Sequence, residues 1–170
     1  TLIPEREIKG IFQIHHGMSE YKERYLPFME YLAEAGYVAA IHDCRGHGKS
    51  VRSQGDLGYM YGGGAQALVE DAHQITIDLK EKWPNMPLIL FGHSMGSLVV
   101  RDYTREYDRD IDMLIVCGSP SKNNFLAMGK MIAAVQGKLF GKHHISKILE
   151  AASFGAFAGK FPGEKSHFCW

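Results

Sequence analysis

Short apolar runs alternate with longer amphipathic segments along the first 120 residues of the chain. The apolar runs have the length and composition of buried strands, and they cover residues 8–15, 37–41, 87–91 and 113–117. The segments between them repeat apolar residues at helical spacing, over residues 21–35, 65–83 and 94–107. This alternation predicts an α/β fold, with a mostly parallel sheet and helices on both of its faces.

The chain changes character after residue 120, where the strand-like runs stop. Two apolar stripes at helical spacing follow, formed by Phe125, Leu126, Met128, Met131, Ile132, Val135, Leu139 and Phe140, and then by Ile145, Ile148, Leu149, Ala152 and Phe154. We therefore predict two domains, an α/β core over residues 1–120 and a helical segment over residues 121–170.

The sequence Gly92-His93-Ser94-Met95-Gly96 lies directly between a predicted strand and a predicted helix. A strand, a tight turn and a helix expose a serine hydroxyl at the end of the sheet, and glycines on either side allow the two elements to approach closely. This context is more specific than the pattern alone, and it favours Ser94 as a nucleophile over a plain strand-to-helix turn.

Composition and charge narrow the range of partners. Lys and Arg together number 19, as do Asp and Glu, so a net charge of zero gives no electrostatic case for nucleic-acid binding. Cys44 and Cys117 lie at the ends of apolar runs, where cysteine usually serves as a small buried apolar residue. Such unpaired cysteines fit a reducing compartment, so we predict a cytoplasmic protein. No apolar run reaches the length of a membrane span.

Three loops that follow predicted strands carry a resemblance to a known family. They are residues 16–20 (His-Gly-Met-Ser-Glu), residues 43–50 (Asp-Cys-Arg-Gly-His-Gly-Lys-Ser) and the serine turn. In order and spacing, from about residue 8 to about residue 120, they resemble the α/β-hydrolases of the monoacylglycerol lipase and lysophospholipase group. One departure is Tyr21, where many members of the group have histidine. The resemblance implies that residues 121–170 are a helical cap; two ordinary packing helices are the alternative.

Ester hydrolysis by Ser94 requires two N–H donors for the oxyanion, one of them from the residue after the nucleophile. That residue is Met95. The second donor comes from the loop after His15, and the resemblance points to the amide of Met18. Gly17 is explained by a sharp turn that aims this amide, or by a strand that simply ends there.

A serine nucleophile also needs a general base and an orienting carboxylate, which this family places after later strands. Only one predicted strand follows Ser94, and the sequence after it, Gly118-Ser119-Pro120-Ser121, contains no carboxylate. His167 is the only histidine after the two apolar stripes, and Glu164 lies too close to it in sequence to orient it. The resemblance therefore suggests a fragment of a longer hydrolase, lacking the C-terminal strands and inactive alone.

The remaining candidates have mostly structural interpretations. We expect His16 to orient its loop through hydrogen bonds, residues 43–50 to form a self-bonded turn, and His73 to lie at the surface. His143 and His144 lack a nearby cysteine or carboxylate at ligand spacing, so no metal and no organic cofactor is predicted.

The predicted function is hydrolysis of carboxylic esters of single-chain lipids, lysophospholipid or monoacylglycerol, through an acyl-enzyme at Ser94. The implied partners are a small amphiphilic ester, lipid surfaces in transient contact and the remainder of the parent chain. A peptidase or a short-chain esterase on the same fold remains open, and so does a non-catalytic binding domain that kept the serine turn.

Overall fold

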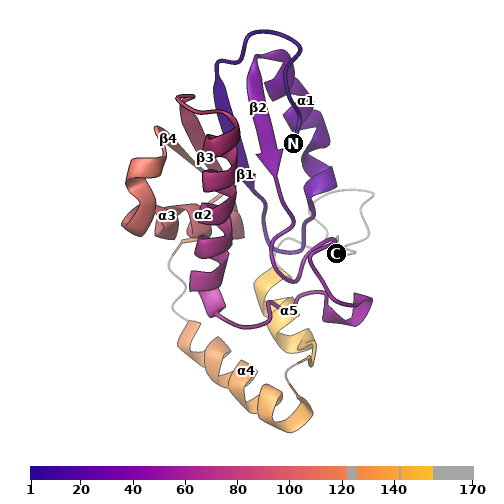
Figure 1. The fold of residues 1–170 in the computed structure, drawn as a ribbon. Helices are drawn as coiled ribbons and strands as arrows, with labels where there is room; N and C mark the ends of the chain where they lie inside the picture. The colour runs from indigo at the N-terminus through magenta and orange to yellow at the C-terminus, as the bar shows by residue number, and fades with distance from the viewer. Residues whose placement is uncertain (122–125, 142, 155–170) are drawn as a thin grey trace. The chain divides into compact units, whose positions relative to one another are not determined.

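The computed structural model describes residues 1–121, 126–141 and 143–154 (Figure 1). Within it the chain divides into two compact units, one from Thr1 to Pro120 and one that begins at Ser121. Phe125, Glu164 and His167 lie outside the described residues, so the predictions for them stay untested. The interpretation of residues 121–170 as a cap also stays a prediction.

The first unit is built on a four-stranded sheet with the strand order β2-β1-β3-β4, in which every neighbouring pair is parallel. The strands are β1 (Gly10–His15), β2 (Tyr37–Ile41), β3 (Leu88–His93) and β4 (Met113–Cys117). The predicted parallel sheet is therefore confirmed, with small shifts at the strand ends. β3 runs two residues past the apolar run because Gly92 and His93 still pair with Val116 and Cys117 of β4.

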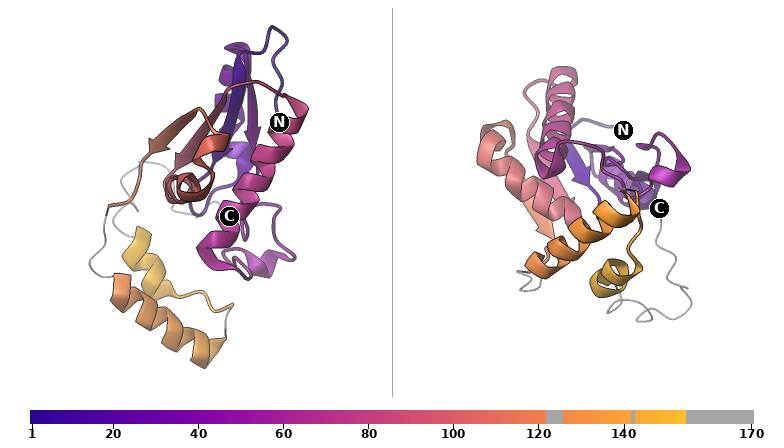
Figure 2. Two further views of the ribbon diagram at one scale, coloured as in Figure 1. Left: turned by 60° about the vertical axis from the view of Figure 1, so that its left-hand side comes forward. Right: turned by 90° about the horizontal axis from the view of Figure 1, so that it is seen from below.

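Helices cover both faces of this sheet, as predicted (Figures 1 and 2). One face packs against α1 (Leu26–Glu34), and the other packs against α2 (Gly64–Lys82) and α3 (Met95–Tyr107). Short 3₁₀ turns precede α1 at Lys22–Tyr25, lie in a loop at Gln54–Asp56 and follow α3 at Asp108–Asp110. The predicted helix over residues 21–35 is thus a 3₁₀ turn followed by an α-helix. Pro27 lies in the first turn of this α-helix, where backbone N–H groups have no helical partner and the missing N–H of proline has no cost.

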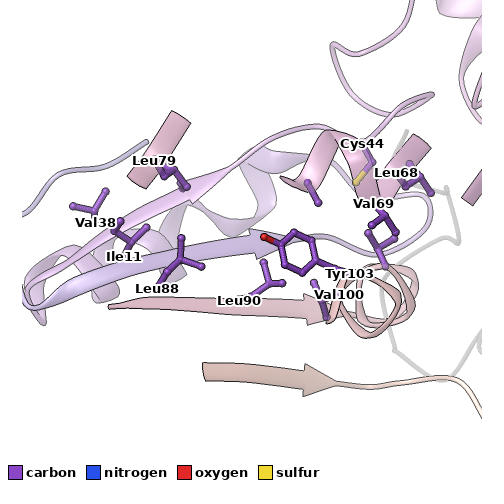
Figure 3. Close-up of a cluster of buried hydrophobic side chains, with 13 residues drawn as sticks. Ile11, Val38, Cys44, Leu68, Val69, Leu79, Leu88, Leu90, Val100 and Tyr103 are labelled. Carbon is purple, nitrogen blue, oxygen red and sulfur yellow. The ribbon is translucent and has the colours of Figure 1, made fainter. Parts of the chain in front are cut away.

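The strand β1 supplies side chains to both faces through its period of two. Phe12 and Ile14 pack on the side of α1, whereas Ile11 belongs to the larger core beside α2 and α3 (Figure 3). Gln13 is also turned toward α2, because its side-chain amide donates to the carbonyl of Ala72 at 2.9 Å. His15 is next in this row, and its side chain is fully buried.

The strand β4 is less covered than its neighbours, with Met113 54% exposed and Val116 41% exposed. The second unit contains α4 (Leu126–Phe140) and α5 (Lys147–Phe154), which contact each other. Among the described residues, no helix has both the length and the apolar character that crossing a membrane requires.

Candidate active site

Ser94 lies in the turn between β3 and α3, at the carboxyl end of the sheet. Its backbone has φ 52° and ψ −114°, a conformation that side chains rarely adopt and that costs about 1–3 kcal/mol. The surrounding backbone holds it there: the Ser94 N–H donates to the carbonyl of Cys117 at 3.0 Å, and the Ser94 carbonyl accepts from the N–H and the hydroxyl of Ser97. The strand, turn and helix predicted around Ser94 are present as β3, the turn at Ser94 and α3, whereas the role of Ser94 as a nucleophile stays a prediction.

The two glycines of this turn are required by close backbone packing. A Cβ atom on Gly92 would lie 2.4 Å from the carbonyl oxygen of Gly96, and one on Gly96 would lie 2.3 Å from the carbonyl oxygen of His15. Because the obstructing atoms are backbone, they have little freedom to retreat. The glycines therefore let α3 begin directly against the end of β1.

The loop after β1 passes beside Ser94. A Cβ atom placed on Gly17 would lie 3.1 Å from the Cβ of Ser94, so the two backbones are in van der Waals range. Met18 follows Gly17 in this loop, and Met95 is the first residue of α3, where backbone N–H groups have no partner within the helix. The structure thus places Gly17, the residue before Met18, against Ser94, and the roles of the Met18 and Met95 amides stay a prediction.

Glu20 links this loop to the serine turn. Its Oε2 atom accepts hydrogen bonds from the N–H of Gly17 at 2.6 Å and from the hydroxyl of Tyr25 at 2.9 Å, and lies 3.3 Å from Nδ1 of His93. Burial by itself would raise the pKa of Glu20, but the bonds from Gly17, Tyr25 and His93 outweigh it and lower the pKa below its ordinary value. Glu20 is therefore a carboxylate at neutral pH.

The sequence analysis quoted Glu20 as part of a motif but assigned it no role. Only its spacing of three residues from Gly17 hints at a bond within the loop. The link to His93 spans 73 residues of sequence, which no local pattern reveals.

His16 acts as a hydrogen-bonding link, as predicted. Its Nδ1 donates to the carbonyl of Gly17 at 2.8 Å, and its Nε2 accepts from the N–H of Cys44 at 2.9 Å. These partners define the neutral tautomer with the proton on Nδ1. Burial lowers the pKa of His16 in spite of the bond to Gly17, which keeps the ring neutral.

The loop of residues 43–50 is held by polar bonds, some within the loop and some to Lys22 and α2, which supports the structural interpretation. The buried Asp43 carboxylate accepts from the N–H of Lys22 at 2.8 Å and of Lys49 at 3.0 Å, and it forms an ion pair with the Lys22 ammonium. Arg45 forms a two-pronged bond to Asp71 on α2, with N–O distances of 2.5 and 2.8 Å. The side chains of Asp43 and Arg45 are thus engaged in holding the loop.

His73 lies in the middle of α2, and its partners do not belong to the serine turn. Its Nε2 is 2.9 Å from a carboxylate oxygen of Asp110, and its ring stacks on Tyr107 at 3.6 Å. Both partners precede β4, whereas Ser94 follows β3, so His73 is not placed to accept a proton from Ser94. Within the described residues, no hydrogen bond joins the Ser94 hydroxyl to a histidine.

The parallel sheet, its helices on both faces and the serine turn at its carboxyl end define an α/β-hydrolase. Comparison with known proteins agrees: the model of the family described as serine aminopeptidase, S33, matches residues 6–155. The chain belongs to this family, and within it to the monoacylglycerol lipase group.

Among its relatives, the chain is 27% identical over 139 residues to a monoacylglycerol lipase from Mycolicibacterium smegmatis, covering 82% of this chain and 47% of that protein. It is 30% identical over 111 residues to the phospholipase YtpA from Bacillus subtilis, covering 65% and 40%. Among solved structures, a thermostable carboxyl esterase from Bacillus coagulans in complex with glycerol superposes with a TM-score of 0.72 at 32% identity, covering 79% and 43%. The chain thus spans less than half the length of these relatives.

Proposed function

We propose that this chain carries the nucleophile and the oxyanion donors of a hydrolase that cleaves carboxylic esters of single-chain lipids. The observation that carries the proposal is the strained Ser94 turn packed against the loop that contains Gly17. The φ angle of Ser94 is 52°, and a Cβ atom placed on Gly17 would lie 3.1 Å from the Cβ atom of Ser94. Strain of this kind persists only where surrounding structure imposes it, and it clusters at active sites.

In the proposed reaction, the Ser94 oxygen attacks the ester carbonyl while its proton passes to a general base outside the described residues. The N–H groups of Met18 and Met95 hold the resulting oxyanion, which lowers the barrier most where water is excluded. Collapse of the intermediate breaks the ester bond, and the leaving alcohol takes the proton from the base. Water then releases the fatty acid from Ser94 by the same steps.

The substrate class is supported by the names of the relatives. A monoacylglycerol lipase and a phospholipase both act on lipid esters, and both align with the part of the chain that contains Ser94. The apolar stripe of α4, which includes Met128 and Met131, also fits an acyl chain, since flexible thioethers adapt to variable shapes. We therefore propose a lysophospholipid or a monoacylglycerol as substrate.

Two other functions have some support. The similarity to a carboxyl esterase fits other carboxylic esters, a short-chain ester among them, and the family description, serine aminopeptidase, fits a peptide. Hydrolysis of long-chain monoacylglycerol, lysophosphatidylcholine, a short aryl ester and an aminoacyl anilide by the protein separates these cases. We expect the two lipids to be preferred, and a strong preference for the aryl ester or the anilide would contradict the lipid proposal.

Covalent labelling tests the nucleophile independently of turnover. A fluorophosphonate probe should modify the full-length protein at Ser94 with a stoichiometry of one, and Ser94→Ala should abolish the label. Ser119→Ala, at an exposed position after β4, is the matched control and should keep it. Absence of label on the folded protein, or equal label on Ser94→Ala, would support the non-catalytic alternative.

A further inference from the structure

His15, His42 and Cys44 bring two imidazoles and a thiol together beneath the loop of residues 43–50. One ring nitrogen of each histidine and the sulfur of Cys44 all lie within 4.8 Å of one another. The parallel register explains the meeting: Ile14 pairs with Ile41, so His15 and His42 are the next residues along the two strands. The rings meet edge to face at 5.0 Å between centroids.

The histidine nitrogens in this cluster have unused hydrogen-bonding capacity. Nδ1 of His15 and Nδ1 of His42 are both buried and have no hydrogen-bond partner. A buried polar atom without a partner is costly, and each such atom in a native structure calls for an explanation. A bound ion accounts for two of them at once.

We propose that His15, His42 and Cys44 form a binding site for Zn²⁺, with Nδ1 of each histidine and the Cys44 thiolate as ligands. Two imidazoles and one thiolate are a donor set that zinc accepts in proteins, with a fourth position for water. Ligand atoms around tetrahedral zinc lie about 3.3–3.6 Å apart, since Zn–N is about 2.0 Å and Zn–S about 2.3 Å. One nitrogen of each ring and the sulfur already lie within 4.8 Å of one another, so side-chain rotations that turn both Nδ1 atoms toward the sulfur and shorten these separations by about 1 Å complete the site.

The three groups of the cluster are buried and uncharged without a metal. Burial lowers the pKa of both His15 and His42 and raises the pKa of the Cys44 thiol to about 12, so the cluster holds two neutral imidazoles and a protonated thiol at pH 7. Cys44 is 2% exposed and has no disulfide partner. When zinc binds, the Cys44 thiol gives up its proton to solvent and the sulfur forms the bond to the metal.

Binding also requires a change at Gln13. The side-chain nitrogen of Gln13 lies 3.2 Å from Nε2 of His15, which makes that atom a hydrogen-bond acceptor. Once Nδ1 binds zinc, Nε2 carries the ring proton, so the Gln13 amide has to turn its oxygen toward it. This turn gives up the bond that Gln13 donates to the Ala72 carbonyl and the bond that it accepts from the Thr76 hydroxyl. Two hydrogen bonds are exchanged for three metal–ligand bonds.

The proposed site connects two loops at the end of the sheet. His15 directly precedes the His16–Glu20 loop, and Cys44 already donates its N–H to His16. A zinc ion on His15 and Cys44 therefore cross-links the loop beside Ser94 to the loop of residues 43–50. The inference concerns binding and stability, so it does not depend on the proposed hydrolase activity.

Cobalt titration of the protein, freed of metal by chelation and kept reduced, tests the site. We expect a thiolate-to-cobalt charge-transfer absorption that saturates at one equivalent and disappears when zinc is added. Cys44→Ser should abolish the absorption, and Cys117→Ser, which changes the exposed cysteine of β4, should leave it unchanged. His42→Gln should weaken cobalt binding at least tenfold.

Thermal unfolding gives a second readout. Zinc should raise the melting temperature of the wild type and of Cys117→Ser, and it should leave that of His42→Gln nearly unchanged. Far-ultraviolet circular dichroism establishes whether each variant is folded. If Cys44→Ser does not fold, the response of folded His42→Gln to zinc and cobalt decides the test. No thiolate absorption in the folded wild type, or the same absorption in Cys44→Ser, overturns the proposal.

Discussion

A single carboxylate oxygen, Oε2 of Glu20, contacts the N–H of Gly17, the hydroxyl of Tyr25 and the ring of His93. Gly17 belongs to the loop beside Ser94, and His93 precedes Ser94 directly. The orientation of the amides next to Ser94 thus depends on a residue that does not itself meet the proposed substrate. Ser94 is the residue that we propose reacts with substrate, whereas Glu20 positions the backbone around it.

Replacing Glu20 by Gln keeps the acceptor oxygen but removes the charge. Since hydrogen bonds to charged groups are about twice as strong as neutral ones, we expect fluorophosphonate labelling of Ser94 to slow about tenfold. Glu23→Gln is the matched control, because Glu23 forms exposed ion pairs with Lys22 and Lys49. Equal labelling rates in the two variants would show that the charge of Glu20 does not matter.

Ser94 itself allows strain to be separated from chemistry. Ser94→Ala and Ser94→Gly both remove the hydroxyl, but only glycine relieves the positive φ. We expect Ser94→Gly to be more stable than Ser94→Ala by about 1 kcal/mol in urea unfolding, after the entropy cost of glycine is subtracted. Equal stability would mean that the turn is not strained in solution.

At the scale of elements, the contact between α3 and β1 determines where the serine turn lies. The strands, helices and serine turn were predictable because period-two and helical patterns are local, and because Gly92 and Gly96 flank the serine at fixed spacing. The bond from Glu20 to His93 and the cluster of His15, His42 and Cys44 were not, because each depends on strand register or loop geometry between distant residues. His15 and His42 are far apart in the sequence and meet only through the pairing of β1 with β2. The sequence analysis therefore considered only the adjacent histidines, His143 and His144, as metal ligands.

The predicted cost of a side chain at the α3 contact can be measured with Gly96→Ala. The new Cβ atom would lie 2.3 Å from the His15 carbonyl oxygen, so α3 or β1 must shift, at a cost of about 3 kcal/mol in the free energy of unfolding. Gly137→Ala in α4 is the control, since a Cβ there meets nothing within 4 Å and should stabilise the helix by about 0.5–1 kcal/mol. Urea unfolding monitored by circular dichroism distinguishes the two, and a neutral Gly96→Ala would contradict the close packing.

At the scale of the whole molecule, both hydrophobic clusters and all the candidate site residues belong to residues 1–120. A chain that ends at Pro120 should therefore keep its α/β circular dichroism spectrum and unfold cooperatively in urea. Loss of cooperative unfolding would show that the first unit depends on the residues after it.

Acid should weaken the first unit partly through Glu20. Because the folded-state pKa of Glu20 lies below its ordinary value of 4.5, its contribution to stability is present above pH 4.5 and is lost as the pH falls through the folded-state pKa. The free energy of unfolding of the wild type should thus fall more steeply below pH 4.5 than that of Glu20→Gln, by at most about 1.4 kcal/mol per pH unit. Urea unfolding at a series of pH values measures both slopes, and parallel slopes would contradict the lowered pKa.

The hydrogen bond from the Ser94 amide to the Cys117 carbonyl has a mechanical consequence. β4 is the edge strand of the described sheet, and Cys117 is its last residue. Tension on the chain beyond Cys117 would act on this 3.0 Å bond and on the pairing of Cys117 with His93. The backbone of Ser94 is therefore coupled to the end of β4 by one hydrogen bond and by the strand that precedes it.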